Sequence, residues 1–232
     1  MNIEPLSPEV LSQLRELSTC VVASAIETFN VRLRNVGFTN SSMHCVFPEL
    51  PRLVGYAATA RIRSADPPME GHSYYARPEW WQYIQTIPEP RVVVVQDVDN
   101  SPGLGAFVGE VHAHILMALG CHGIVTNGAV RDLRALRKAG FQMFAGNVSV
   151  SHAYAHVFDF GGAVEVGGMN VNPGDLLQGD IHGVQTIPRE IAARVPSAAN
   201  NILQKRQSLV EICCSSGFTP EKLHDAVKRL ES

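Results

Sequence analysis

GEVHAHILMALGCHGIVTNGAVRD, which occupies residues 109–132, is the stretch that decides the fold of this chain. Its first half places apolar residues at helical intervals, at Val111, Ile115 and Leu119. Two glycines then interrupt the pattern and precede a short apolar run at residues 124–125. We therefore predict a helix, a turn, a strand and a loop, in that order, within this stretch.

The segments on either side extend the alternation. Residues 91–97 form a run rich in β-branched side chains, which is typical of a strand buried on both faces of a parallel sheet. Residues 133–139 have a helical pattern, and residues 142–148 are predicted to be extended. The order β-α-β-α-β predicts an α/β fold with a parallel sheet.

Two loops of this predicted sheet carry polar residues suited to a binding site. Glu110 lies in a loop after one strand, and Arg131 and Asp132 lie in a loop after another. In open α/β sheets, ligands bind in the crevice outside the carboxyl ends of the strands, so we expect these residues to meet on one rim. The helix that begins near Gly109 would add the positive end of its dipole to that rim.

The pair of Arg131 and Asp132 has two interpretations. Arg131 can bind a carboxylate with two hydrogen bonds, and Asp132 can supply an oxygen ligand to Mg²⁺ or Mn²⁺. Alternatively, Asp132 only caps the next helix and Arg131 forms a surface ion pair. The pair alone does not decide between a site and a structural role.

Two longer motifs carry a resemblance. GIVTNGAVRDLRALRKAGFQMFAGNVSVS at residues 123–151 and VEVGGMNVNPGDLLQGDIHGVQTIP at residues 164–188 closely resemble the RraA-like family. This family includes regulators of ribonuclease E activity and class II aldolases that act on 4-hydroxy-4-methyl-2-oxoglutarate and 4-carboxy-4-hydroxy-2-oxoadipate. The resemblance covers residues 53–188 and is strong from Gly109 onward.

The resemblance implies a fold and a set of site residues. The fold is a swivelling β/β/α domain with N-terminal helices, placed at residues 1–188, and a helical C-terminal tail at residues 189–232. The substrate is a 2-oxo acid, the cofactor is Mg²⁺ or Mn²⁺, and the assembly is a homotrimer or a homohexamer. The implied residues are the substrate-binding loop Gly109, Glu110, Val111 and His112, the substrate arginine Arg131 and the metal ligand Asp132.

The chain departs from the family pattern in two places. Glu110 stands where the aldolases have an aspartate that positions metal-bound water. Residues 23–27, Ala-Ser-Ala-Ile-Glu, lack the aspartate that the family often has in its first helix. The resemblance also allows an acid from a neighbouring subunit to complete the crevice, and Asp175 and Asp180 are the candidates in this chain.

The expected function is that of a metal-dependent lyase. It would cleave 4-hydroxy-4-methyl-2-oxoglutarate or a similar substrate to pyruvate by a retro-aldol reaction, with Arg131 stabilising the enolate and Glu110 moving a proton. Decarboxylation of oxaloacetate passes through the same enolate and is an expected side activity. The alternative is a non-catalytic regulatory protein that resembles the ribonuclease E inhibitors.

Composition limits the other classes of function. The net charge of −3 and the scattered Lys and Arg residues argue against direct binding of nucleic acid. No apolar run is long enough for a membrane span and no signal-peptide pattern is present, so we expect a cytoplasmic protein. The five cysteines have no C-x-x-C spacing, which predicts reduced thiols that lie mostly in the core.

The rest of the chain gives simpler expectations. Helices should begin after Ser7 and Thr219 and run over residues 19–29, with an irregular connection at 32–51 and a strand at 57–63. Residues 164–188 should form a compact β-meander with a hairpin turn at residues 167–168. Pro196 should interrupt the C-terminal helical tail.

Three further groups are candidates for function. His152 and His156 would form a zinc pair on a helix, but residues 148–158 fit a strand equally well. Asp97 and Asp99 would either join the metal shell through water or form a turn at the end of a strand. The aromatic segment at residues 66–84 would be a lid over the site or, as we favour, part of a subunit interface.

Overall fold

The computed structural model describes residues 3–68 and 77–231 of the chain. Its helices are α1 Pro8–Glu16, α2 Thr19–Glu27, α3 Pro78–Thr86, α4 Glu110–Ala118, α5 Leu133–Ala139, η1 Ala192–Arg194 (a 3-10 helix), α6 Val195–Cys214 and α7 Pro220–Glu231. Its strands are β1 His44–Cys45, β2 Leu53–Arg63, β3 Arg91–Asp97, β4 Ala106–Val108, β5 Cys121–Val130, β6 Gln142–Val148, β7 His156–Phe160, β8 Val164–Val166, β9 Met169–Val171, β10 Leu176–Asp180 and β11 Gly183–Ile187.

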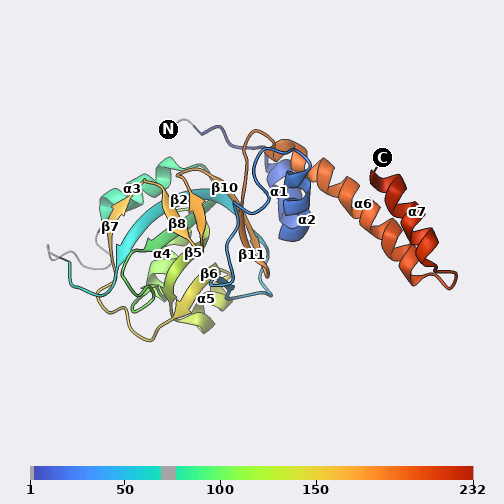
Figure 1. Cartoon of the computed structure of the whole chain (residues 1–232). Helices are drawn as coiled ribbons and strands as arrows, with labels where there is room; N and C mark the ends of the chain where they lie inside the picture. Colours follow the sequence, from blue (N-terminus) through green and yellow to red (C-terminus); the bar gives the residue numbers. More distant parts are fainter. Residues whose placement is uncertain (1–2, 69–76, 232) are drawn as a thin grey trace.

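A mixed sheet forms the centre of the molecule (Figure 1). Its main path has the order β1-β6-β5-β3-β2-β10-β11, with β4 paired to β5 and β7 paired to β2. The strands β2, β3, β5 and β6 are parallel to their neighbours in that order, whereas β10 and β11 continue the sheet in the antiparallel sense. The predicted α/β class and the β-α-β-α-β core are confirmed.

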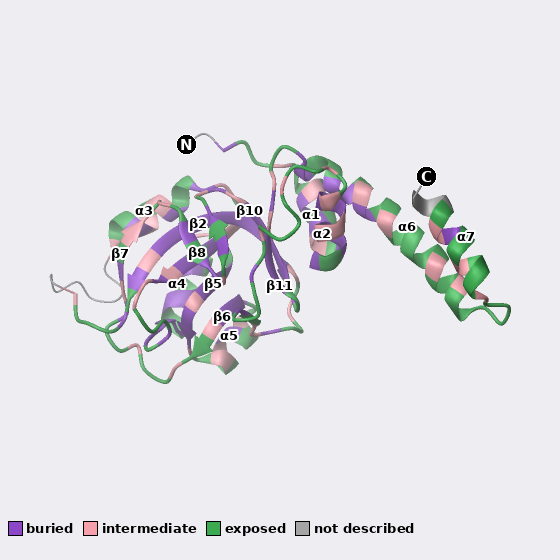
Figure 2. Cartoon of the chain, in the orientation of Figure 1, coloured by how far each residue is buried: buried purple, intermediate pink, exposed green. Residues whose placement is uncertain are grey.

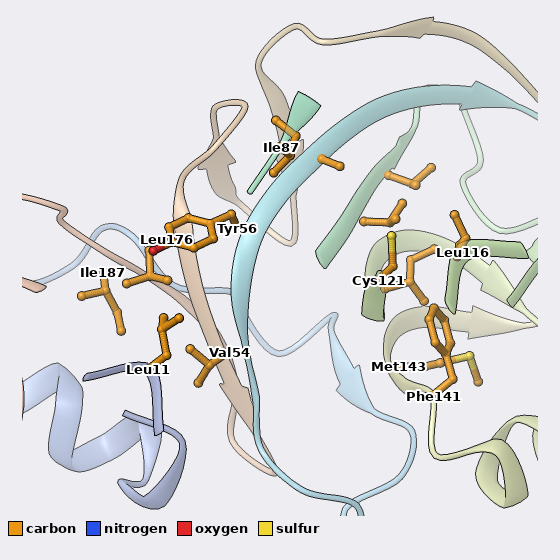
Figure 3. Packing of buried hydrophobic residues seen from close by; sticks show 14 of the residues in the cluster. Leu11, Val54, Tyr56, Ile87, Leu116, Cys121, Phe141, Met143, Leu176 and Ile187 are labelled. Carbon is orange, nitrogen blue, oxygen red and sulfur yellow. The ribbon is translucent and has the colours of Figure 1, made fainter. Parts of the chain in front are cut away.

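Both faces of this sheet are buried, as the β-branched run at residues 91–97 predicts. Val93 and Val95 of β3 belong to one hydrophobic core, and Val92 and Val94 belong to the other. Figure 3 shows part of the first core, where Leu11 of α1 lies near Val54. Successive side chains of a strand point to opposite faces, so one valine run supplies both cores.

The segment at residues 164–188 differs from the predicted meander. The hairpin turn at residues 167–168 is confirmed, since β8 pairs with β9 around it. However, β8 and β9 form a separate two-stranded sheet, whereas β10 and β11 join the main sheet. The reason is packing: the apolar side chains of β8 and β9 cover the second core instead of extending the sheet edge. These side chains are Val164, Val166, Met169 and Val171.

A buried polar network attaches the N-terminal helices to the sheet. Both carboxylate oxygens of Asp180 accept hydrogen bonds from Thr19, one from its backbone N–H at 2.9 Å and one from its hydroxyl at 2.7 Å. The amide of Gln178 donates to the backbone carbonyls of Leu14 and Leu17 at the end of α1. Asp180 is therefore occupied inside its own subunit, which leaves no support for it as the acid of a neighbouring crevice.

The helices after the sheet form a projecting arm. Figure 1 shows α6 and α7 extending away from the sheet, and Figure 2 shows that most of their surface is exposed. The prediction that Pro196 interrupts this tail is wrong. Pro196 lies in the first turn of α6, where its missing N–H would have had no partner inside the helix.

The cysteines do not lie mostly in the core, and two of the exposed ones are on the arm. All five are free thiols, but only Cys121 is buried and Cys45 is half-buried. Cys213 and Cys214 are exposed because they end α6 on the arm, and Cys20 is exposed on α2. The predicted absence of disulfides holds, and the predicted burial of most thiols is wrong.

The aromatic segment divides at the edge of the described structure. Tyr74 and Tyr75 lie outside the described residues. Within α3, Trp80 is buried in the subunit's own core and stacks on Tyr83, with ring centroids 5.7 Å apart. For Trp80, both the lid and the interface predictions are wrong, because its ring is packed inside the subunit.

Among the described helices, none combines the length and the apolar character that crossing a membrane would require.

We expect Asp180→Ala to lower the free energy of unfolding at pH 7 by about 2 kcal/mol or more, because charge-assisted hydrogen bonds to Thr19 are lost. Burial alone would raise the pKa of Asp180, but hydrogen bonds from His182 and Thr19 outweigh it and lower the pKa. A lowered folded-state pKa stabilises the protein above the unfolded pKa of about 4, and the effect disappears as pH falls through the folded value. Urea unfolding at several pH values tests this. A difference between the variant and the parent that does not shrink below about pH 4 would contradict it.

Candidate functional site

The candidate site is built where two adjacent strands end. The short strand β4 runs parallel to the end of β5, with Ala106 opposite Ala129 and Val108 opposite Val130. The backbone N–H of Arg131 donates to the carbonyl oxygen of Val108 at 3.0 Å. This pairing brings the start of α4 and the loop after β5 to the same rim, although they are about twenty residues apart in the sequence.

Asp132 connects the two loops directly. Its Oδ2 accepts a hydrogen bond from the backbone N–H of Glu110, the first residue of α4, at 2.9 Å. The first N–H groups of a helix have no partner within it, and a carboxylate there also meets the positive end of the helix dipole. Asp132 therefore caps α4, a helix that lies before it in the sequence.

The backbone of Asp132 supports this role. Asp132 precedes α5, as predicted, but its side chain makes no capping hydrogen bond to α5. Its φ of 55° and ψ of 37° lie in the left-handed region, which a residue other than glycine rarely adopts. This backbone conformation is a local cost of order 1–3 kcal/mol, and such strained residues concentrate at functional sites.

Arg131 lies beside the same carboxylate. Its Nε is 3.3 Å from Oδ1 of Asp132, and about a third of each side chain is exposed. The hydrogen bond from Glu110 is the main cause that lowers the pKa of Asp132, and Arg131 lowers it further. Asp132 is therefore ionised at neutral pH, which a metal ligand requires, and it stays partly open to solvent.

Gly109 makes the close approach possible. A Cβ atom on Gly109 would lie 2.6 Å from Oδ2 of Asp132 and 3.2 Å from Cγ of Arg131. The φ of Gly109 is −124°, so the limited space beside Asp132, and not the backbone conformation, favours glycine here. Gly109 lies at the rim, next to both residues, as the predicted substrate loop requires.

The other residues of the predicted loop point in different directions. Glu110 and Val111 are exposed, with Val111 58% accessible. His112 is buried, and its ring packs edge-on against Phe107 with Nδ1 3.2 Å from the carbonyl oxygen of Phe107. Burial lowers the pKa of His112 to about 4, so the ring is neutral at physiological pH. The ring of His112 is thus a packing group, and the expected contact with substrate is left to its backbone.

Asp97 and Asp99 hold loops in place. Oδ2 of Asp97 accepts from the N–H of Gly103 at 2.8 Å, and Oδ2 of Asp99 accepts from the N–H of Ser64 at 2.6 Å. Burial raises the pKa of Asp97. These contacts match the turn-forming alternative and give no support to a role in a metal shell.

The proposed zinc pair does not form on a helix. His152 lies in the loop after β6, and His156 begins β7, so the four-residue spacing has no helical meaning here. Within residues 3–68 and 77–228, no group of three or more His, Cys, Asp and Glu side chains is arranged to hold a metal ion. A protein-only zinc cage is therefore not found in this region.

A hard divalent cation is a better fit to the donor set. Mg²⁺ is commonly held by one or two carboxylates, with water and substrate oxygens completing its coordination. Asp132 offers an ionised and partly exposed carboxylate of this kind. Its Oδ2 accepts from the start of α4 and its Oδ1 accepts from Arg131, which leaves about two of the four lone-pair sites of a carboxylate for a cation.

His152 is a polar residue near the site whose position the sequence did not reveal. Its Nδ1 lies 2.6 Å from the carbonyl oxygen of Ala106 in β4. Ala106 lies three residues before Gly109, which lies against the carboxylate of Asp132. Sequence spacing suggested only a partnership with His156, because no pattern within the loop indicates that it folds back along β4.

Comparisons with known proteins agree with this architecture. The profile of the family described as Aldolase/RraA matches residues 19–185. A protein of Halalkalibacterium halodurans named "Putative 4-hydroxy-4-methyl-2-oxoglutarate aldolase" is 26% identical over 199 residues, which cover 85% of this chain and 81% of that protein. Protein DlpA of Legionella pneumophila is 25% identical over 148 residues, 62% of this chain, and the match spans only 23% of DlpA.

Two solved structures share the fold. An uncharacterised protein from Pseudomonas syringae pv. tomato has a TM-score of 0.72 at 21% identity, covering 99% of this chain and 97% of its own. Streptomyces coelicolor RraAS2, described as an unusual member of the RNase ES inhibitor RraA family, has a TM-score of 0.67 at 20% identity, covering 88% and 96%. At these identities, the likeness concerns the fold alone.

We expect Gly109→Ala to lower the free energy of unfolding by about 1–3 kcal/mol, because the new methyl group must displace Asp132 from α4. Gly162→Ala is the matched control, since a Cβ there meets nothing within 4 Å, and it should change stability by less than about 0.5 kcal/mol. Equal unfolding midpoints for the two variants in urea would contradict the tight contact at Gly109.

Proposed function

Because the chain belongs to the Aldolase/RraA family, we propose that it is a divalent-metal-dependent lyase that acts on 2-oxo acids. The proposed reaction is retro-aldol cleavage of 4-hydroxy-4-methyl-2-oxoglutarate or a similar substrate to pyruvate, with oxaloacetate decarboxylation as a side activity. The observation that supports it most is the ionised, partly exposed carboxylate of Asp132 beside Arg131 at the start of α4.

The rim offers two kinds of group to an anionic substrate. The guanidinium of Arg131 can bind a carboxylate or an enolate oxygen through charge-assisted hydrogen bonds. The first turn of α4 adds the positive end of a helix dipole at Gly109 and Glu110. We propose that the backbone at Gly109, Glu110, Val111 and His112, together with the side chain of Arg131, binds the substrate.

The chemistry needs charge stabilisation rather than a covalent amine. When bound, Mg²⁺ or Mn²⁺ would supply a Lewis acid for the keto oxygen, and Asp132 is the residue proposed to hold it. Arg131 would stabilise negative charge on the enolate oxygen as the carbon–carbon bond breaks. Each contribution of about 1.4 kcal/mol to the barrier is worth a factor of ten in rate.

Proton transfer to the pyruvate fragment is assigned to Glu110. Its carboxylate is exposed at the rim, while its backbone is held by Asp132. Glu110, or a water molecule that it orients, would move the proton at the enolate carbon. Glutamate reaches further than the aspartate usual in the aldolases, so we expect the same task to be performed with a longer side chain.

The second candidate is a regulatory binding protein. The matching family is described as Aldolase/RraA, so it includes RraA proteins as well as aldolases, which supports this alternative. In such a protein, Asp132 would serve mainly to cap α4, and Arg131 would form the ion pair that is observed. The two candidates differ in one measurable property: a lyase converts a 2-oxo acid to pyruvate, whereas a regulatory protein does not.

The division of the chain, its assembly and its location are also proposals. We propose a globular unit at residues 1–188 and a helical extension at residues 189–232, which corresponds closely to the projecting arm of α6 and α7. A cytoplasmic homotrimer or homohexamer that binds neither nucleic acid nor membrane is the assembly and location that we propose. A net charge of −3 supports the expectation for nucleic acid.

Pyruvate release tests the proposed function. With Mn²⁺ present, the chain should release pyruvate from 4-hydroxy-4-methyl-2-oxoglutarate and from oxaloacetate in an assay coupled to lactate dehydrogenase. Both reactions pass through the same enolate, so chelator should abolish both activities. Asp132→Ala should lower kcat/KM for each substrate by about 100-fold or more. Arg131→Lys should also impair both, since lysine cannot reproduce the guanidinium fork.

A carboxylate variant far from the rim controls for general damage. Asp225→Ala on α7 should keep the rates of the parent chain. Calorimetric titration with Mn²⁺ gives a second readout, in which Asp132→Ala alone should weaken binding. If the parent chain shows no metal-dependent turnover of any 2-oxo acid, the regulatory candidate is favoured instead.

A further inference from the structure

The loop after β6 is fixed along β4 by several hydrogen bonds. The backbone N–H of Ala106 donates to the carbonyl oxygen of Ser151 at 2.8 Å, and the hydroxyl of Ser149 donates to the carbonyl oxygen of Leu104 at 3.0 Å. A Cβ on Gly105 would lie 2.3 Å from the carbonyl oxygen of His152, so the two backbones are in close contact. The backbone of His152 is thus held firmly against the strand that leads to the candidate site.

The ring of His152 is oriented as well. A carbonyl oxygen only accepts hydrogen bonds, so the contact of 2.6 Å with Ala106 assigns the proton to Nδ1. In a neutral ring, Nε2 then has the lone pair and is the basic nitrogen. Histidine held by a backbone carbonyl in this way is a common arrangement for a proton-transfer group.

His152 also lies near the metal-ligand candidate. It is joined to β4 at Ala106, and β4 leads to Gly109, which lies against the carboxylate of Asp132. Along the chain, Ala106 and Gly109 are separated by three residues, about 10 Å of extended strand. The ring of His152 contacts Ala106 at the first end of this span, and Asp132 lies against Gly109 at the other end. A dicarboxylate with a five-carbon backbone that is bound at Asp132 would therefore extend along β4 toward His152.

Retro-aldol cleavage requires a base that the proposed site has not yet supplied. The hydroxyl on the fourth carbon must lose its proton, whereas Glu110 is assigned to the enolate carbon of the other fragment. We propose that Nε2 of His152 is the base that takes this hydroxyl proton. The proposal rests on the proposed lyase function and adds a residue to it.

The step balances without any further reactant. Nε2 takes the hydroxyl proton, the oxygen electron pair forms the carbonyl of the leaving keto acid, and the bond between the third and fourth carbons breaks. That bonding pair becomes the enolate of pyruvate, which gains a proton at the third carbon. The imidazolium of His152 then releases its proton to solvent, so no oxidation or reduction occurs.

Comparing oxaloacetate with the hydroxy acid substrate distinguishes the proposed role of His152 from the roles of Asp132, Arg131 and Glu110. Its decarboxylation forms the same enolate but has no hydroxyl proton to remove. His152→Ala should therefore lower kcat for retro-aldol cleavage by about 100-fold or more, the usual effect of losing a general base, and change decarboxylation by less than about threefold. Imidazole added to His152→Ala should restore part of the retro-aldol rate, and His152→Asn, which leaves less space, should respond less.

His224→Gln on α7 is the matched control and should leave both rates unchanged. Retained decarboxylation of oxaloacetate by His152→Ala serves as the folding control, because it shows that the rim is intact. An equal loss of both activities in His152→Ala, or full retention of both, would overturn the assignment. If the parent chain has neither activity, the proposed function itself fails; if it decarboxylates oxaloacetate but cleaves no hydroxy acid, the base is refuted while the metal-dependent rim stands.

Discussion

The rest of the candidate site depends on the hydrogen bond between the carboxylate of Asp132 and the backbone N–H of Glu110. This bond joins the loop after β5 to the start of α4, and it fixes where the carboxylate, the guanidinium of Arg131 and the helix dipole meet. It also favours a glycine at 109, because a Cβ there would lie 2.6 Å from Oδ2 of Asp132 and would displace the carboxylate. The position of the carboxylate, the charge of Arg131 beside it and the glycine at 109 therefore all depend on this one hydrogen bond.

The fold could be predicted where local pattern and tertiary environment agree. The valines at residues 92–95 predicted a strand buried on both faces, and they supply both cores. Ser7 and Thr219 were predicted to cap helices, and each hydroxyl accepts a hydrogen bond from a backbone N–H in the first turn of its helix. These signals are local, so tertiary packing did not alter them.

Other features depended on contacts that no local pattern encodes. Residues 164–188 show three turns, but nothing in their spacing states that β8 and β9 would cover a core while β10 and β11 extend the sheet. Trp80 was placed in a lid or an interface, since a cluster of aromatic residues does not show which ring is buried. The positions of Glu110, Arg131 and Asp132 on one rim were predictable from topology, whereas the approach of His152 depends on a loop that folds back along β4.

Asp132 caps α4, and we propose that its remaining lone pairs hold a divalent cation beside Arg131. Anomalous diffraction from crystals soaked with Mn²⁺ and oxalate, which imitates the enolate of pyruvate, tests this claim most directly. We expect a manganese peak about 2.0–2.3 Å from a carboxylate oxygen of Asp132, with oxalate bridging the ion and the guanidinium of Arg131. An ion bound elsewhere, or none bound while the bond from Asp132 to Glu110 stays intact, would contradict the claim.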